Sequence, residues 1–302
     1  MPVEIRPYTP DDLPGVHALY NELTADRVPH CWPVAAPLLG AALTEGAVET
    51  RWARLEEQAV LVAIQGRQLA GFIHLGRQAA NKWQGEHGII RFFAYRRGQR
   101  PVGDALLSAA ESWLRQRQLP RGVALPQPWG YTFYGFPHTY LSDHLDHVQA
   151  LLRFRGFNKS GGEVFLDWLD MRPEAVPDDS GLEYELQVEK RPGSGPLPGL
   201  AVRAQQGDTA IGTCTLDSGA ESSAAPQAHA YAFCNGLNVN EAYQGRGLGR
   251  FLLAHALCRA HAIGYRHGAI STAHDNERAF LFYANYGFCV VDWTYEFSKE
   301  LT

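Results

Sequence analysis

Apolar side chains recur with two different periods along the chain, and the changes between these periods predict alternating strands and helices. Leu253, Leu257 and Ala260 follow one another after four and three residues, which places them on one face of a helix over residues 248–262. Apolar runs with a period of two predict strands, and clusters of Gly and Pro separate the elements. This order of strands and helices predicts an α/β fold in which a mixed sheet is flanked by helices.

The same patterns place the other elements. In the first half of the chain, helices are predicted over residues 11–24 and 34–58, followed by a hairpin that turns at residues 65–67. In the second half, another helix ends at Gly287, and Asp275 is its expected N-cap residue. Strands of the second half are predicted at residues 182–189, 199–206, 208–219, 229–239 and 268–273.

The final segment, residues 289–298, alternates strictly between apolar and polar side chains. This alternation is typical of a half-buried strand, with one face in the core and the other toward solvent. The two expected faces are Cys289, Val291, Trp293, Tyr295 and Phe297 on the apolar side, and Asp292, Thr294, Glu296 and Ser298 on the polar side.

Residues 170–199 contain the densest cluster of Pro and Gly in the chain. Because these residues interrupt regular structure, we expect the domain boundary within this stretch. The predicted division is a first domain over residues 1–171, a linker over 172–181 and a second domain over 182–302.

A faint repeat relates the two halves. Residues 95–114 resemble 243–260, and residues 151–168 resemble 282–298 when their Gly-Phe pairs are aligned. Each half therefore has a Gly-bearing loop, a helix, a second helix that ends in Gly-Phe, and a final strand. This order indicates a duplicated module.

Composition narrows the class of protein. The 302 residues carry a formal charge of −5, with 45% hydrophobic and 20% charged residues, which is ordinary globular composition and argues against a general nucleic-acid binder. The sequence has no apolar run of about 18 residues and no apolar signal core, so we expect a cytoplasmic protein without a membrane partner. The five cysteines form no CxxC pair, which predicts free thiols rather than a zinc site or a disulfide framework.

Candidate chemistry begins at residues 243–249, Tyr-Gln-Gly-Arg-Gly-Leu-Gly, which lie between a predicted strand and a predicted helix. Amides at the start of a helix have no helical acceptor and lie at the positive end of the helix dipole. An anionic group such as a pyrophosphate could therefore bind there. Glycines also form ordinary tight turns, so the loop alone leaves both interpretations open.

A second motif strengthens the first interpretation. Asn276, Ala279 and Tyr283 lie on one face of the predicted helix that ends in Gly287-Phe288. The combination of Gln244-x-x-Gly247-x-Gly249 with this helix resembles the GNAT superfamily of acyl-CoA-dependent N-acyltransferases. The resemblance covers residues 231–298, and it implies acetyl-CoA as acyl donor and no metal.

The resemblance assigns a role to each matching residue. It implies that Asn276 binds the pantetheine arm, and that the backbones of Leu237 and Val239 bind pantetheine and the acyl carbonyl, where an amide would stabilise the oxyanion. The implied pyrophosphate loop consists of Gln244, Gly245, Arg246, Gly247, Leu248 and Gly249.

Tyr283 occupies the position of the general acid in the family. A tyrosine hydroxyl with a pKa of about 10 can protonate a departing thiolate whose parent pKa is about 8.5. No diagnostic motif identifies a general base, and a water relay would serve instead. The polar residues expected near the pocket are His229, Asn235, Asn238, Glu241 and His274.

The first half lacks the residues that carry this resemblance. Leu145 and Leu152 occur where the second half has Asn276 and Tyr283, and Pro101 replaces Gly247 and removes an amide donor. The first half thus resembles the degenerate copy of tandem GNAT proteins. His138, His144 and His147 could suggest a metal site, but they fall at a predicted helix start, where such residues commonly cap or face solvent.

We therefore expect two tandem GNAT-like α/β domains, each with a mixed, mostly antiparallel sheet flanked by helices. The expected activity is acetyl-CoA-dependent N-acetylation of a small-molecule or peptide amine by the second half. A non-catalytic acyl-CoA sensor and a transferase for longer acyl groups stay open. The second half has no sequence for helices that would wall the acceptor side, so we expect the first half, especially residues 128–140, or residues 170–199 to supply that wall.

Overall fold

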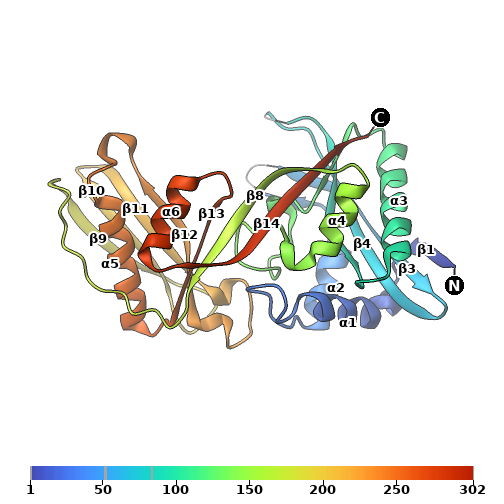
Figure 1. Cartoon of the computed structure of the whole chain (residues 1–302), viewed down its shortest axis with the longest axis horizontal. Helices are drawn as coiled ribbons and strands as arrows, with labels where there is room; N and C mark the ends of the chain where they lie inside the picture. The colour runs from blue at the N-terminus through green and yellow to red at the C-terminus, as the bar shows by residue number, and fades with distance from the viewer. Residues whose placement is uncertain (1, 51–52, 83, 302) are drawn as a thin grey trace. The chain divides into compact units, whose positions relative to one another are not determined.

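The computed structural model describes residues 2–50, 53–82 and 84–301. The chain forms two compact units, one of Met1–Glu163 with Asp292–Thr302 and one of Val164–Val291 (Figure 1). Strands β8 (Asn158–Trp168) and β14 (Cys289–Glu300) each have residues in both units. This division differs from the boundary expected at 172–181, because strand pairing rather than Pro and Gly content decides to which unit a segment belongs.

The sheet of the first unit has the strand order β1-β3-β4-β5-β6-β14, with β2 paired to β3 and β7 to β14. Of these strand pairs, as far as the described residues show them, only β5–β6 is parallel. Its strands are β1 (Val3–Pro7), β2 (Val48–Glu49), β3 (Arg54–Gln65), β4 (Gln68–Gln78), β5 (His87–Tyr95), β6 (Arg121–Ala124) and β7 (Leu141–Ser142). Its helices are α1 (Leu13–Thr24), α2 (Ala36–Thr44), α3 (Arg100–Gln116) and α4 (Asp146–Phe154).

Two predictions for this unit have different outcomes. The hairpin turn is confirmed, since Gln65 pairs with Gln68 and Gly66 between them has a φ of 68°. The helix expected over residues 34–58 is wrong beyond Thr44, because α2 ends there and β2 and β3 follow. Residues of β3 pair with β1, β2 and β4, and this cross-strand pairing overrides the local helical pattern.

The aromatic stretch 128–140 lies in the core of the first unit. The ring of Tyr131 stacks on Phe92 at 5.5 Å between centroids, and Phe133 meets Tyr20 edge to face at 5.7 Å. The Tyr131 hydroxyl lies 2.8 Å from Nδ1 of the buried His74. These contacts with β4, β5 and α1 make these aromatic rings part of the hydrophobic core of the first unit.

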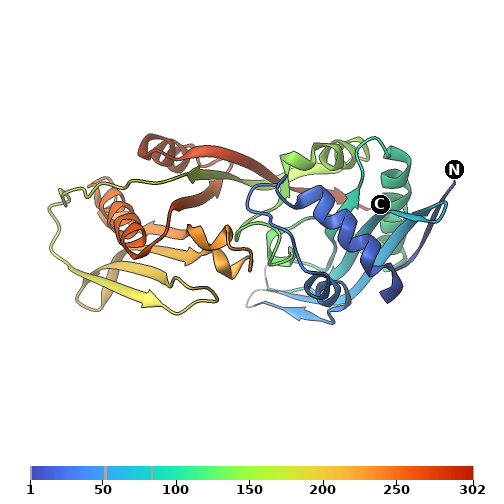
Figure 2. The ribbon, with the colours of Figure 1, turned by 90° about the horizontal axis from the view of Figure 1, so that it is seen from below.

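The second unit contains the predicted strands in the order β13-β12-β11-β10-β9, antiparallel except for the parallel β12–β13 pair (Figures 1 and 2). Helix α5 packs on this sheet, and Gly212 of β11 permits the approach, since a Cβ there would lie 2.8 Å from Leu252 Cδ1. The elements are β9 (Glu185–Arg191), β10 (Gly199–Gln206), β11 (Thr209–Ser218), β12 (Tyr231–Val239), β13 (His267–Ala273), α5 (Leu248–Ile263) and α6 (Glu277–Tyr286).

The final strand departs from its expected faces. Asp292 and Thr294 are buried, at 5% and 0% exposure, although the alternation places them on the polar side. Thr294 pairs with Ser142 of β7 in the first unit. The expectation of a solvent-facing polar side is wrong for these two residues. The Thr294 hydroxyl donates to the Glu163 carbonyl at 3.3 Å, and the Asp292 carboxyl is hydrogen-bonded to Ser142.

Candidate functional site

Strand β12 separates from its parallel neighbour halfway along its length. Its pairing with β13 ends at Cys234 and Ile270, whereas its pairing with β11 continues to Val239. The β11–β12 register shifts between Thr215 and Leu216, next to the point where β12 separates from β13. Leu237 and Val239 therefore present backbone groups at an edge that β13 does not occupy.

The glycine loop follows this edge and opens α5. Gly245 and Gly247 have φ angles of 77° and 86°, a left-handed conformation that favours glycine. Gly247 is the N-cap residue of α5, and the helix's own bonding starts with the Phe251 amide donating to the Gly247 carbonyl at 3.0 Å. The amides of Leu248 and Gly249 thus lie in the first turn, where a helix offers them no acceptor.

One cavity of about 510 Å³ gathers the residues that the sequence singles out. Besides them, it is lined by Tyr243, Arg250, Arg278, Ala279 and Phe282. The singled-out residues among its lining are Leu237, Val239, Gln244, Gly245, Gly247, Leu248, Gly249, Asn276 and Tyr283. Arg246 is exposed and lies outside this lining.

Helix α6 places two polar side chains beside the loop. Asn276 is the N-cap residue, and its Oδ1 accepts a hydrogen bond from the Ala279 amide at 3.1 Å. The expectation that Asp275 caps this helix is wrong, because Asn276 takes the position one residue later. Gly287 ends the helix with a φ of 115°, as predicted. Tyr283 is 7% exposed, and its ring meets Phe282 edge to face at 5.2 Å.

The expected general-base candidates do not line the cavity. Asn235 Nδ2 instead donates to Asp217 Oδ2 at 2.6 Å on the strand edge beside it. His274 Nδ1 lies 3.9 Å from the Asp275 carboxylate. Sequence reasoning missed Asp217. Its one distinguishing feature in the sequence is that it is a polar residue at the end of a strand with alternating apolar and polar positions.

In the described part of the chain, two arginines that line the cavity and a third on the exposed loop beside it have no carboxylate partner. Among the described residues, Arg246, Arg250 and Arg278 form no ion pair, and Arg278 Nη1 donates only to Gln244 Oε1 at 3.4 Å. A set of unpaired guanidinium groups beside exposed amides favours a multiply charged anion. Sequence reasoning missed this feature, because pairing depends on which carboxylates the fold brings near.

The equivalent loop of the first unit has its arginines engaged. Arg96, Arg97 and Arg100 pair with Glu22, Asp146 and Asp104, respectively. This arrangement leaves no comparable free cationic set at that loop within the described residues.

The helices that follow this loop also close on each other. A Cβ on Gly103 of α3 would lie 2.6 Å from Leu151 Cδ2 of α4 and 2.7 Å from Tyr95 Cε1. The Tyr95 hydroxyl donates to the His147 carbonyl at 2.8 Å, and His147 Nε2 lies 2.8 Å from the Tyr95 carbonyl. Packed side chains therefore fill the place where the second unit has a cavity, and His147 is engaged with backbone. No group of three or more potential metal ligands occurs among the described residues.

The described part of the chain contains no helix that is both long and apolar enough to cross a membrane. A comparison with curated proteins found no match. Residues 163–288 match the model of the acetyltransferase (GNAT) family, a range that nearly coincides with the second unit.

Solved structures share the fold of this chain at low sequence identity. A tandem GNAT protein from the clavulanic acid biosynthesis pathway is 15% identical, with a TM-score of 0.66 over 100% of this chain and 99% of its own. The GCN5-related glucosamine N-acetyltransferase region of a fungal multi-domain β-N-acetylglucosaminidase is 14% identical, with a TM-score of 0.66 over 99% of this chain, which spans 38% of that protein. A GCN5-related N-acetyltransferase from Sphaerobacter thermophilus is 12% identical, with a TM-score of 0.61 and coverage of 99% and 96%. Residues 163–288 are therefore similar to the acetyltransferase (GNAT) family, and the chain has the fold of tandem GNAT proteins.

Proposed function

We propose that the second unit transfers an acetyl group from acetyl-CoA to the nitrogen of a small-molecule or peptide amine. One observation carries this proposal: the glycine loop, the open edge of β12 and the polar face of α6 all line one cavity. The family of the domain supports acyl-CoA as the donor class. The unpaired arginines beside the loop complement the phosphate charges of such a donor.

The proposed roles follow from where each group lies. Amides of the loop residues 245–249 bind the pyrophosphate, and Asn276 offers its Nδ2 hydrogens to the pantetheine arm, because its Oδ1 already accepts from Ala279. A backbone amide at Leu237 or Val239 stabilises the oxyanion that forms when the amine attacks the thioester carbonyl. Arg246, exposed at the loop, contributes charge.

Tyr283 is proposed as the general acid. When the tetrahedral intermediate collapses, the carbon–sulfur bond breaks and the CoA thiolate leaves. The Tyr283 hydroxyl then donates a hydrogen bond or its proton to the sulfur, and the attacking nitrogen loses its proton to solvent. The burial of Tyr283 at 7% exposure within the cavity wall suits a donor to a desolvated thiolate.

The proposed compartment is the cytoplasm. The five cysteines form no CxxC pair, which is typical of free thiols in a reducing compartment.

The experiment that tests this proposal measures thiol release from acetyl-CoA with a panel of primary amines and N-terminal peptides. Mass spectrometry of the transferred group distinguishes acetyl from longer acyl donors. Acylation of at least one amine supports the proposal. Tight binding of acyl-CoA without turnover on any amine would favour the sensor alternative, and absence of CoA binding would overturn both.

A further inference from the structure

A separate cavity lies at the C-terminal end of α5, opposite the glycine loop. Its volume is about 440 Å³. Because an α-helix rises about 1.5 Å per residue, His261 lies about 21 Å along α5 from Gly247. None of the residues that line this cavity also lines the candidate donor cavity. The lining residues are Asp170, Met171, Arg172, His261 and Arg266.

Backbone hydrogen bonds hold the two sides of this cavity together. The Asp170 amide donates to His267 Nδ1 at 3.0 Å, and the Met171 amide donates to the Arg266 carbonyl at 2.9 Å. Met171 is buried, at 1% exposure. The start of the Pro- and Gly-rich stretch is thus fastened to the residues around the start of β13, and the cavity is formed before any ligand binds.

Basic side chains predominate in the lining. Arg266 Nη2 pairs with Asp170 Oδ1 at 2.6 Å, and this bond holds the pKa of the Asp170 carboxyl below its ordinary value. Asp170 is therefore ionised at neutral pH and offsets the charge of one arginine. Within the described residues, neither Arg172 nor His261 forms a hydrogen bond or an ion pair. One guanidinium and one imidazole are thus left for a ligand.

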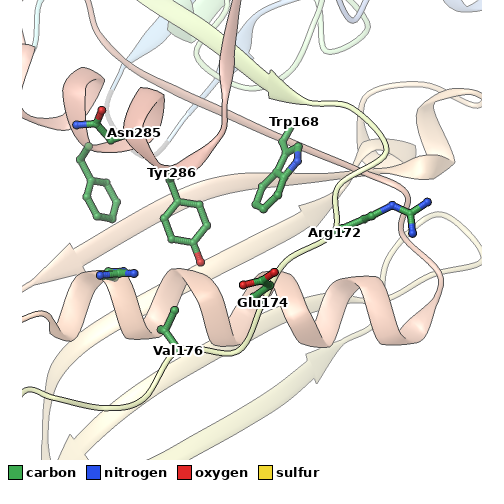
Figure 3. A pocket seen from close by; sticks show the side chains of 8 residues that line it. Trp168, Arg172, Glu174, Val176, Asn285 and Tyr286 are labelled. Atoms are coloured by element: carbon green, nitrogen blue, oxygen red, sulfur yellow. The ribbon is translucent and has the colours of Figure 1, made fainter.

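Arg172 is directed away from the aromatic residues next to it. It also borders a cavity of about 530 Å³ that contains Trp168 and Tyr286, but its guanidinium points away from both of these rings (Figure 3). Its charge is therefore available at the cavity that it shares with His261 and Arg266.

The end of α5 does not account for these basic groups. Arginine and histidine near a helix C-terminus often bind the last carbonyls of the helix. Here backbone amides take that place, since Gly264 donates to the His261 carbonyl and Tyr265 to the Ala260 carbonyl, both at 3.1 Å. The basic side chains at the cavity are thus not needed to cap the helix.

We infer that this cavity binds a phosphate group, carried by inorganic phosphate or by a small phosphate monoester. The parallel N–H groups of Arg172 bind two phosphate oxygens, a geometry that a guanidinium fits. His261 donates to a third oxygen, and Arg266 adds charge while Asp170 holds it in place. This binding is independent of acyl transfer, because it uses none of the residues of the donor cavity.

Titration of the full chain with inorganic phosphate and with phenyl phosphate, followed by ³¹P NMR, tests the inference. CoA is present in excess, so that phosphate does not occupy the glycine loop. Arg172→Gln should weaken phosphate binding by about 10-fold or more, the loss of hydrogen bonds from a charged group. Arg259→Gln is the matched control, since it removes the same charge from α5 outside the cavity lining, and it should keep the wild-type affinity.

Tighter binding of inorganic phosphate would identify the free ion as the ligand, and tighter binding of phenyl phosphate would identify a monoester; either result supports the site. Equal affinities of Arg172→Gln and the wild type would overturn the inference, as would absence of phosphate binding once CoA is in excess. If CoA itself does not bind, the proposed function fails, and the comparison of Arg172→Gln with Arg259→Gln still decides this inference.

Discussion

The side-chain amide of Gln244 donates a hydrogen bond to the backbone carbonyl of Val239 at 2.8 Å. This bond ties the first residue of the glycine loop to the last residue of β12. It fixes the position of the loop amides relative to the open edge of β12, so that one extended ligand can contact both. The loop is thus placed by the strand before it as well as by the helix after it.

Replacing Gly247 with Ala should weaken CoA binding by about 10-fold or more, the loss of one charge-assisted hydrogen bond. The new side chain disfavours the φ of 86° that Gly247 adopts, at a cost of about 1–2 kcal/mol, and turns the following amides away. Calorimetric titration with CoA measures the change. Gly207→Ala is the control, since Gly207 also has a positive φ of 56° and open space around its missing Cβ. Equal CoA affinities in the two variants would contradict the loop's role.

Replacing Tyr283 with Phe should lower kcat by about 10²–10⁴-fold while the affinity for acetyl-CoA changes little, because only the proton donor is lost. Steady-state thiol release with a reactive amine gives this measurement. Tyr265→Phe is a matched control, since the Tyr265 hydroxyl donates to the Pro198 carbonyl at 3.1 Å. That control should lose stability but keep its kcat. A Tyr283→Phe enzyme with wild-type turnover would make Tyr283 a packing residue.

Asp292 should make the protein less stable as the pH rises from about 4 to about 6. Burial raises the pKa of this carboxyl to about 6, so the folded state binds its proton more tightly than the unfolded state does. Stability is therefore greatest below the unfolded pKa and falls until the pH passes the folded pKa. Between pH 4 and pH 7, the free energy of unfolding of Asp292→Asn should rise by about 2–3 kcal/mol relative to that of the wild type, as denaturant unfolding measures.

The control for this prediction is Asp12→Asn. The hydrogen bonds from Arg6 lower the pKa of Asp12 to about 2, so its stabilising effect is lost only as the pH falls below about 4. The difference in the free energy of unfolding between Asp12→Asn and the wild type should therefore stay constant from pH 4.5 to pH 7. A constant difference for Asp292→Asn over the same range would show that its carboxyl is not perturbed by burial.

One CoA should bind per chain. Three features of the first unit oppose a second site. Its loop contains a proline, its loop arginines already pair with carboxylates, and Leu151 packs against Gly103. Calorimetry on the full chain measures the stoichiometry. Arg250→Gln should weaken CoA binding, whereas Arg97→Gln should not. Two equivalent sites per chain would contradict the assignment of a single donor cavity.

Residues 180–302 expressed alone should not fold natively. The fragment lacks Val164–Trp168, which belong to the second unit, and it carries Thr294, Tyr295 and residues 297–300, which pair with strands of the first unit. Circular dichroism and denaturant unfolding should therefore show no cooperative transition. A fragment that unfolds cooperatively and binds CoA as the full chain does would show that these strand segments are dispensable.

The sequence by itself determined the local elements and the candidate donor site. The glycine loop, the helix ending at Gly287 and the strands around them follow from period, capping and backbone freedom, which act over a few residues. The tandem organisation also followed, because a repeat leaves the same short patterns in both halves. Seven of the nine candidate site residues in the cavity come from a strand, loop and helix that are consecutive in the chain, and α6 adds Asn276 and Tyr283.

Only the tertiary structure decided features that depend on distant partners. Most of β14 belongs to the first unit because it pairs with β6 and β7, far away in sequence. The burial of Asp292 and Thr294 likewise depends on distant segments, which supply Ser142 and Glu163 as their partners. The end of α2 at Thr44 and the strands after it depend on pairing of β2 with β3 and of β3 with β4. Which arginines lack carboxylates likewise depends on neighbours that local patterns do not encode. Long-range pairing replaces local preference wherever it buries more surface and satisfies more backbone hydrogen bonds.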